Sequence, residues 1–129
     1  MDTLASWAQQ HARALLQESL PRRWAHVQGV AARARSLATV LGSDADLLEA
    51  AAWLHDIGYT PGLAVMGFHP LDGARYLRDA QHTDVMLCRL VAYHSCAFIE
   101  AQERGLAGVL GREFEPPPDV LGSVLLSAT

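Results

Sequence analysis

Residues 51–58 of this chain read Ala51-Ala52-Trp53-Leu54-His55-Asp56-Ile57-Gly58. An apolar run ends here in a histidine–aspartate pair. Leu47, Ala51 and His55 follow one another at four-residue spacing, so they share one side of a helix. A histidine on the inward side of a helix needs a polar partner. The stretch therefore predicts a helix whose end places an imidazole and a carboxylate, both possible metal ligands, in the interior.

Helical periodicity continues on both sides of this stretch. Apolar residues recur at three- and four-residue spacing and period-two alternation is nearly absent, so we predict an all-α fold, a compact bundle of several helices. We expect a first helix over about residues 2–20 and a second from Pro21 to about residue 41, ended by Gly42. Ser43 is expected to cap the third helix, with Asp44 and Asp46 in its first turn.

Glycine and proline divide the rest of the chain. Residues 58–68 are predicted to form a loop, and Pro70 to open a fourth helix that reaches about residue 78. A fifth helix is expected to begin at Thr83 and Asp84, with a further helical stretch over 98–104, a loop over 105–118, and a last helix capped by Asp119. The chain ends inside the apolar pattern of that helix, so we expect a C-terminal truncation.

The composition bears on whether the chain binds nucleic acid, spans a membrane or uses its cysteines as metal ligands. Half of the residues are hydrophobic, the formal net charge is −4, and all ten basic residues are arginines. This balance argues against binding to a nucleic acid duplex. No apolar run has the length of a membrane span, and the two cysteines have no metal-ligand spacing, so they are expected to be reduced thiols of a cytoplasmic protein.

Four histidines accompany Asp56 at positions that the helical pattern turns inward or places at a helix end: His26, His55, His69 and His94. A single inward histidine is more often a hydrogen-bonded core residue than a ligand. Several of them with a buried carboxylate would leave polar groups unsatisfied unless a metal or a substrate accounts for them. His69 could instead cap the fourth helix, and His94 could be a core histidine. His11 and His82 are expected to be solvated or at helix ends.

Two arginines precede His26 on the same side of the second helix. Arg22 and Arg23 could hold a substrate phosphate there, assisted by the helix N-terminus. A solvated first turn is the alternative for both.

The segment Arg23-Trp24-Ala25-His26, followed 29 residues later by His55-Asp56 and then Ile57-Gly58, resembles the HD superfamily of metal-dependent phosphohydrolases in its HDIG variant. The resemblance covers about residues 20–128 and implies one HD domain over residues 1–129. It implies His26, His55 and Asp56 as metal ligands, with His55 and Asp56 also catalytic. His69 and His94 resemble the additional histidines of two-metal members.

The resemblance also implies a cofactor and a reaction. We expect one or two divalent ions, for which nitrogen and carboxylate ligands suit Mn, Fe, Zn, Co, Ni or Mg. The reaction would be hydrolysis of a phosphate ester of a nucleotide or small metabolite, so the partner is a small phosphorylated substrate. The family's final aspartate ligand has no counterpart here, because Thr129 follows Ala128 and ends the chain. Two alternatives are an HD-type di-iron oxygenase and a non-catalytic binding or regulatory module.

Overall fold

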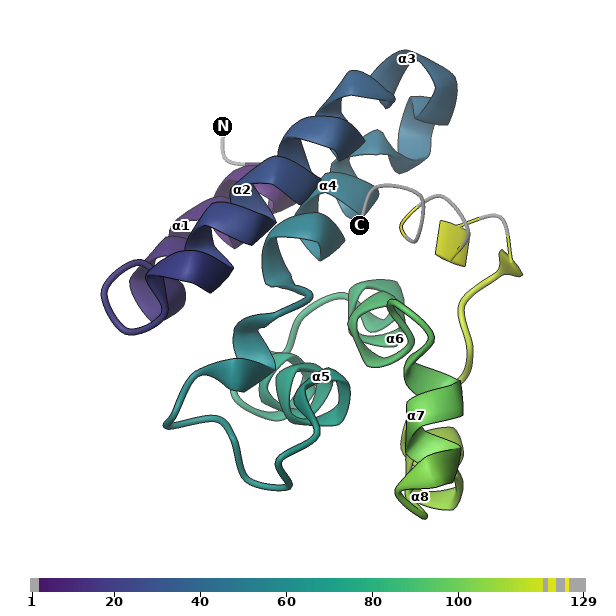
Figure 1. Ribbon diagram of the computed structural model, residues 1–129. Coiled ribbons are helices and arrows are strands. Elements are labelled where there is room, and N and C mark those ends of the chain that lie inside the picture. The colour runs from purple at the N-terminus through teal and green to yellow at the C-terminus, as the bar shows by residue number, and fades with distance from the viewer. Residues whose placement is uncertain (1–2, 120, 123–124, 126–129) are drawn as a thin grey trace.

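Helices form the whole regular structure of the described residues. The computed structural model describes residues 3–119, 121–122 and 125 (Figure 1). Within them the elements are α1 (Leu4–Leu16), α2 (Pro21–Ser36), α3 (Ala38–Leu41), η1 (Gly42–Asp44), α4 (Ala45–Leu54), η2 (Ile57–Tyr59), α5 (His69–Asp79), α6 (Val85–Ala92), α7 (Ala97–Glu103) and α8 (Ala107–Glu113). The predicted all-α class is confirmed.

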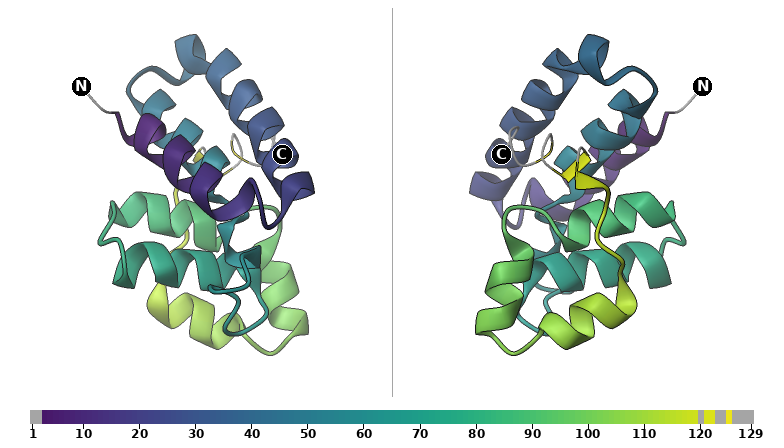
Figure 2. Two further views of the ribbon diagram at one scale, coloured as in Figure 1. Left: turned by 90° about the vertical axis from the view of Figure 1, so that its left-hand side faces the viewer. Right: turned by 90° about the vertical axis from the view of Figure 1, so that its right-hand side faces the viewer.

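Helix α4 is the centre of the packing. It contacts α1 and α2 on one side and α6 on the other, while α5 packs on α6 and on η2. The two views of Figure 2 show α1, α2 and α4 grouped in one half of the molecule and α5 to α8 in the other. Every residue from Ala50 to Leu54 is buried. A stretch of helix that is apolar and buried on every side in this way lies in the middle of a core, whereas the first turns of α4 carry the charged Asp46 and Glu49.

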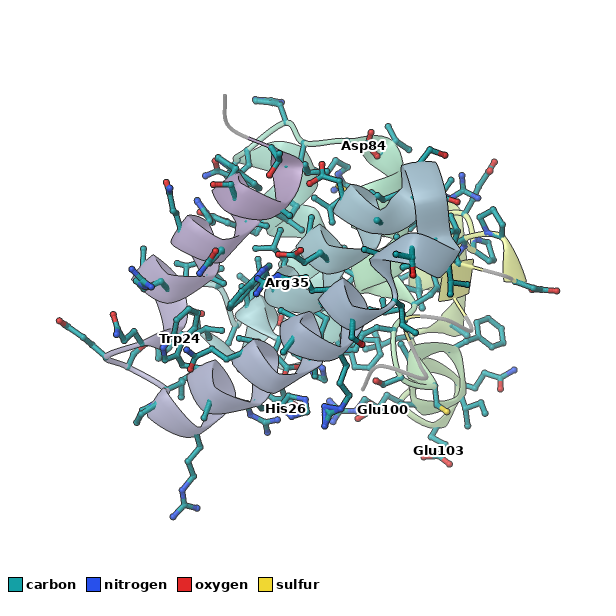
Figure 3. The ribbon with its side chains drawn as sticks, turned by 90° about the horizontal axis from the view of Figure 1, so that it is seen from above. Trp24, His26, Arg35, Asp84, Glu100 and Glu103 are labelled. Atoms are coloured by element: carbon teal, nitrogen blue, oxygen red, sulfur yellow. The ribbon has the colours of Figure 1, made fainter. Side chains whose placement is uncertain are left out.

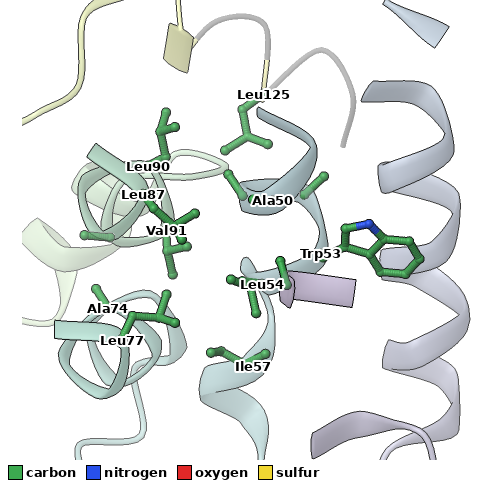
Figure 4. Packing of buried hydrophobic residues seen from close by; sticks show 14 of the residues in the cluster. Ala50, Trp53, Leu54, Ile57, Ala74, Leu77, Leu87, Leu90, Val91 and Leu125 are labelled. Atoms are coloured by element: carbon green, nitrogen blue, oxygen red, sulfur yellow. The ribbon is translucent and has the colours of Figure 1, made fainter. Parts of the chain in front are cut away.

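The core continues from α4 into the second half of the molecule. Figure 4 shows Leu54 and Ile57 facing Leu77, with Leu87 and Val91 of α6 beside them. These five residues are all 0% exposed, so α4, α5 and α6 pack tightly around the end of α4. That end carries His55 and Asp56.

The start of α1 is capped from two directions. The Thr3 side chain accepts a hydrogen bond from the Ser6 amide at 3.0 Å. The Asp46 carboxylate of α4 accepts from the amides of Leu4 at 3.2 Å and Ala5 at 3.0 Å. Helix N-termini leave such amides without an intrahelical partner, so Asp46 joins α1 to α4 through them.

The predicted boundary after the second helix was wrong. Helix α2 ends at Ser36, and Leu37 leaves the helical conformation with its amide bonded to the Ala34 carbonyl at 3.1 Å. The short helix α3 and the turn η1 follow, so Ser43 lies inside η1 and does not cap α4. The apolar spacing runs unbroken through Leu37 and Leu41, which is why it concealed this break.

The loop predicted over 105–118 also contains a helix, α8. Its last residue, Glu113, receives hydrogen bonds from Arg75 and Arg78 of α5. These long-range ion pairs stabilise a short helix that local sequence preference alone does not indicate. Residues 119, 121–122 and 125 are helical, while the remainder of the predicted last helix lies outside the described residues.

Helix α6 begins at Val85, directly after the predicted start at Thr83 and Asp84, and the Asp84 carboxylate caps it by accepting hydrogen bonds from the amides of Met86 and Leu87. Over the described part of the chain, no helix combines the length and the apolar character needed to cross a membrane.

Candidate metal centre

Four imidazoles surround one carboxylate at the junction of the two halves. Asp56 follows the end of α4, and its Oδ2 atom lies 3.5 Å from His55 Nε2 and 3.8 Å from His26 Nε2 of α2. Its Oδ1 atom lies 3.5 Å from His69 Nε2, at the start of α5, and 3.8 Å from His94 Nε2, just after α6. Two three-residue groups with metal-ligand spacing result, and both include Asp56.

The two most buried histidines are fixed by the backbone. His55 Nδ1 lies 2.7 Å from the Ala52 carbonyl oxygen, and His94 Nδ1 lies 2.6 Å from that of Val91. A carbonyl oxygen only accepts, so in each ring Nδ1 carries the proton and donates it. Each Nε2 therefore carries the lone pair, and that of His55 lies 3.5 Å from Asp56 Oδ2. That of His94 lies 3.0 Å from His69 Nε2, which donates to it, and 3.8 Å from Asp56 Oδ1. A backbone bond at Nδ1 is the arrangement by which proteins orient a histidine ligand.

Burial keeps the imidazoles of His55, His69 and His94 neutral. Desolvation, with the neighbouring His55 as a second cause, lowers the pKa of His69 and of His94 to about 3. Desolvation also lowers the pKa of His55. Neutral imidazole is the form that ligates a metal, so three of the four rings are ready to bind one near neutral pH.

Asp56 supplies the evidence that these residues fit a cation. It is 3% exposed, and its Oδ2 atom has no hydrogen-bond partner among the described residues. The nearest cationic group, Arg23 Nη1, is 3.8 Å away, beyond hydrogen-bond distance. A buried carboxylate oxygen without a partner is costly, and divalent ions held by nitrogen and carboxylate donors would satisfy it.

Gly58 allows α5 to approach the histidine–aspartate pair. A Cβ atom on Gly58 would lie 2.0 Å from the carbonyl oxygen of His69 and 2.8 Å from its Cα. Only glycine fits where one backbone comes this close to another. The turn η2 thus brings the start of α5, and with it His69, against Asp56.

Two residues that the sequence reasoning missed hold the loop before His69. The buried Asp72 carboxylate accepts hydrogen bonds from the amides of Met66, at 3.0 and 3.1 Å, and Gly67, at 3.1 Å. Arg104, which follows α7, donates to the Gly67 carbonyl at 2.8 Å. Asp72 could have been found as a carboxylate in the first turn of a helix opened by proline, a position that often binds free amides. Arg104 carries no local signal.

His26 lies at the rim of the centre, so its predicted place on the inward stripe of α2 was wrong. Its side chain is 43% exposed, and Figure 3 shows it at an outer edge of the helix. Val27 and Val30 fill the core beneath α2, which turns His26 toward the end of α4. There its ring lies 5.4 Å from that of His55, between centroids.

Of the other residues that the sequence analysis singled out, some lie where they were predicted and others do not. Arg23 is near Asp56, whereas Arg22 is exposed on the first turn of α2. His82 is exposed, as predicted. His11 is partly buried, with Nε2 2.6 Å from the hydroxyl of Tyr76, so the expectation that it is solvated was wrong. Its helix packs its apolar side inward, and His11 lies on the border of that side.

Comparison with known proteins agrees with the geometry. Residues 23–124 match the family model described as HD domain, a range that contains all four histidines and Asp56. Neither a curated protein nor a solved structure matches the chain significantly. The histidine–aspartate pair at the end of a buried helix and the match over most of the chain identify it as a member of the HD-domain family.

Proposed function

We propose that this protein is a metal-dependent phosphohydrolase that acts on a phosphate ester of a nucleotide or a small metabolite. The observation that carries the proposal is the pair of three-residue donor groups that share the buried carboxylate of Asp56. Many members of the HD superfamily are metal-dependent phosphohydrolases, which supports the same reaction class.

Each donor group would hold one divalent ion. The first consists of His26, His55 and Asp56, and the second of Asp56, His69 and His94. These donors suit Mn, Fe, Zn, Co, Ni or Mg. Such an ion would polarise a phosphoryl oxygen and make hydroxide available near neutral pH.

The protein's own residues would supply orientation and substrate binding. His55 and His94 form the floor of the site, because both are buried and fixed by backbone carbonyls. Asp56 would bridge the two donor groups and accept a hydrogen bond from the attacking water. Arg23 stands beside Asp56 with its side chain 44% exposed, so its guanidinium can meet a phosphate that enters from solvent. Arg22 and the N-terminus of α2 would add to that attraction.

A di-iron oxygenase is the second candidate. His69 and His94 double the number of nitrogen donors, and two histidines with a shared carboxylate on each side also suit iron. The same scaffold without turnover would be a binding or regulatory module.

The test is an assay of phosphate release on a panel of nucleotides and small phosphate esters, with each candidate metal, and with oxygen consumption followed in parallel for iron. We expect metal-dependent phosphate release, lost in Asp56→Asn and retained in the control Asp44→Asn, whose carboxylate makes no capping hydrogen bond. Oxygen consumption without phosphate release would favour the oxygenase. The absence of both activities would favour the binding module.

A further inference from the structure

Tyr59 lies between a histidine of the metal centre and an arginine at its rim. The rings of Tyr59 and His69 are stacked, with centroids 4.0 Å apart and planes at 18°. The guanidinium carbon of Arg23 lies 3.9 Å from the Tyr59 centroid, over the ring. An imidazole and a guanidinium this close to one ring cannot share a face, so they occupy opposite faces.

We propose that Tyr59 is a positioning residue of this site, whose ring orients His69 toward Asp56 on one face and Arg23 on the other. The inference rests on the proposed function, because Tyr59 would serve both the donor group of Asp56, His69 and His94 and Arg23, the arginine proposed to bind the substrate phosphate. It gives a role to Tyr59, the residue that directly follows the sequence His55-Asp56-Ile57-Gly58.

His69 needs such support more than the buried histidines do. Its side chain is 15% exposed, against 2% for both His55 and His94. The rings of His55 and His94 are each held by a backbone carbonyl, whereas the hydrogen bonds of the described residues include no such bond for His69 Nδ1. The His69 ring is instead fixed at its Nε2 atom, 3.0 Å from His94 Nε2, and across its face by stacking on Tyr59. The stacking thus sets the plane of a ring that has no backbone bond at Nδ1.

Arg23 gains order from the other face. An arginine side chain at the surface has many rotamers, and holding it in one of them costs conformational entropy. Contact with the Tyr59 face favours the rotamer in which Nη1 lies 3.8 Å from Asp56 Oδ2. A guanidinium ordered before the substrate arrives binds a phosphate with a smaller entropic loss.

The backbone explains why Tyr59 can serve both neighbours. It is the last residue of η2, and its amide donates to the Asp56 carbonyl at 3.1 Å. The ring therefore projects from the same tight turn that carries the central carboxylate. Both contacts are made through the faces of the Tyr59 ring. Phenylalanine at this position should therefore keep them, and leucine should lose them.

The experiment compares Tyr59→Leu with Tyr59→Phe, its matched control, in the full chain. Metal-free protein is titrated with Mn²⁺ or Zn²⁺ alone, and bound metal is measured by elemental analysis after dialysis. We expect Tyr59→Leu to bind the second ion about 10- to 100-fold more weakly, with little effect on the first, and Tyr59→Phe to bind both like the parent protein. In the His69→Ala background, Tyr59→Leu should cause little further loss of metal affinity.

A second readout does not depend on metal or turnover. NMR of metal-free protein should show ring-current shifts on the His69 ring protons that persist in Tyr59→Phe and disappear in Tyr59→Leu. In the phosphatase assay, Tyr59→Leu should raise KM as Arg23→Gln does.

Parent-like metal binding and unchanged His69 resonances in Tyr59→Leu would overturn the proposal. So would a Tyr59→Phe variant as defective as Tyr59→Leu, because the hydroxyl would then be the active group. A parent protein that binds two ions but releases no phosphate would refute the proposed hydrolysis and leave the positioning role to be decided by the metal titration. If the parent protein binds no metal, the His69 resonances decide it.

Discussion

Replacing Gly58, two residues after Asp56, by alanine should damage the candidate metal centre. The added Cβ would lie 2.0 Å from the His69 carbonyl oxygen and 2.7 Å from its carbonyl carbon. Ordinary contact needs about 3.4 Å or more, so one backbone must retreat by more than about 1 Å. The atoms it meets belong to the backbone, and a side-chain rotation cannot relieve the clash.

The expected cost follows from the packing around η2. Overpacking a core typically costs about 1–3 kcal/mol, and a clash of backbone with backbone belongs at or above the upper end. A loss of about 3 kcal/mol corresponds to a fall of roughly 10 °C in Tm for a domain of this size. His69 would move with its backbone, so we also expect weaker metal binding by the donor group of Asp56, His69 and His94.

Thermal unfolding of metal-free protein and a Mn²⁺ titration measure the two effects. The matched control is Gly62→Ala in the following loop, where an added Cβ meets nothing within 4 Å and should change neither quantity. A Gly58→Ala variant with the parent's Tm and both ions bound would refute the argument that close approach at Gly58 places His69.

Three further outcomes are expected. Burial holds the pKa of His69 and of His94 at about 3, below the unfolded value of 6.5, so the unfolded chain binds protons first and metal-free stability falls with pH below 6.5. Urea unfolding in chelator should show a loss of about 2 kcal/mol per histidine between pH 7 and pH 5, and a flat profile would contradict this. Asp46→Ala should cost about 1 kcal/mol in chemical unfolding by uncapping α1, whereas Asp44→Ala should cost little; equal effects would reject the cap. Arg23→Gln should raise KM for a phosphate ester about tenfold, and an unchanged KM would remove its substrate role.

Local pattern was sufficient for the helical class and for much of the site. Periodicity located the main helices, and the resemblance of the histidine–aspartate pair and the histidine 29 residues earlier to the HD family predicted His26, His55 and Asp56 as metal ligands. The structure brings His69 and His94 to the same carboxylate. Their roles as ligands, like those of Arg22 and Arg23, remain predictions.

What the sequence concealed depends on contacts between distant segments. Helix α8 was missed because its end is held by Arg75 and Arg78, more than thirty residues earlier. The rim position of His26 was missed because periodicity gives a broad face and does not say which edge of it lies over the end of α4. Tyr59 escaped notice because its role lies in stacking across the fold, which no spacing rule indicates.

The most direct test of the metal centre is anomalous diffraction from crystals loaded with Mn²⁺ or Zn²⁺, for the parent protein and for Asp56→Asn. We predict anomalous peaks beside both carboxylate oxygens of Asp56, one among the Nε2 atoms of His26 and His55 and one among those of His69 and His94, and their loss in the variant. Crystals with no peak at Asp56, or peaks that persist unchanged in Asp56→Asn, would contradict the account.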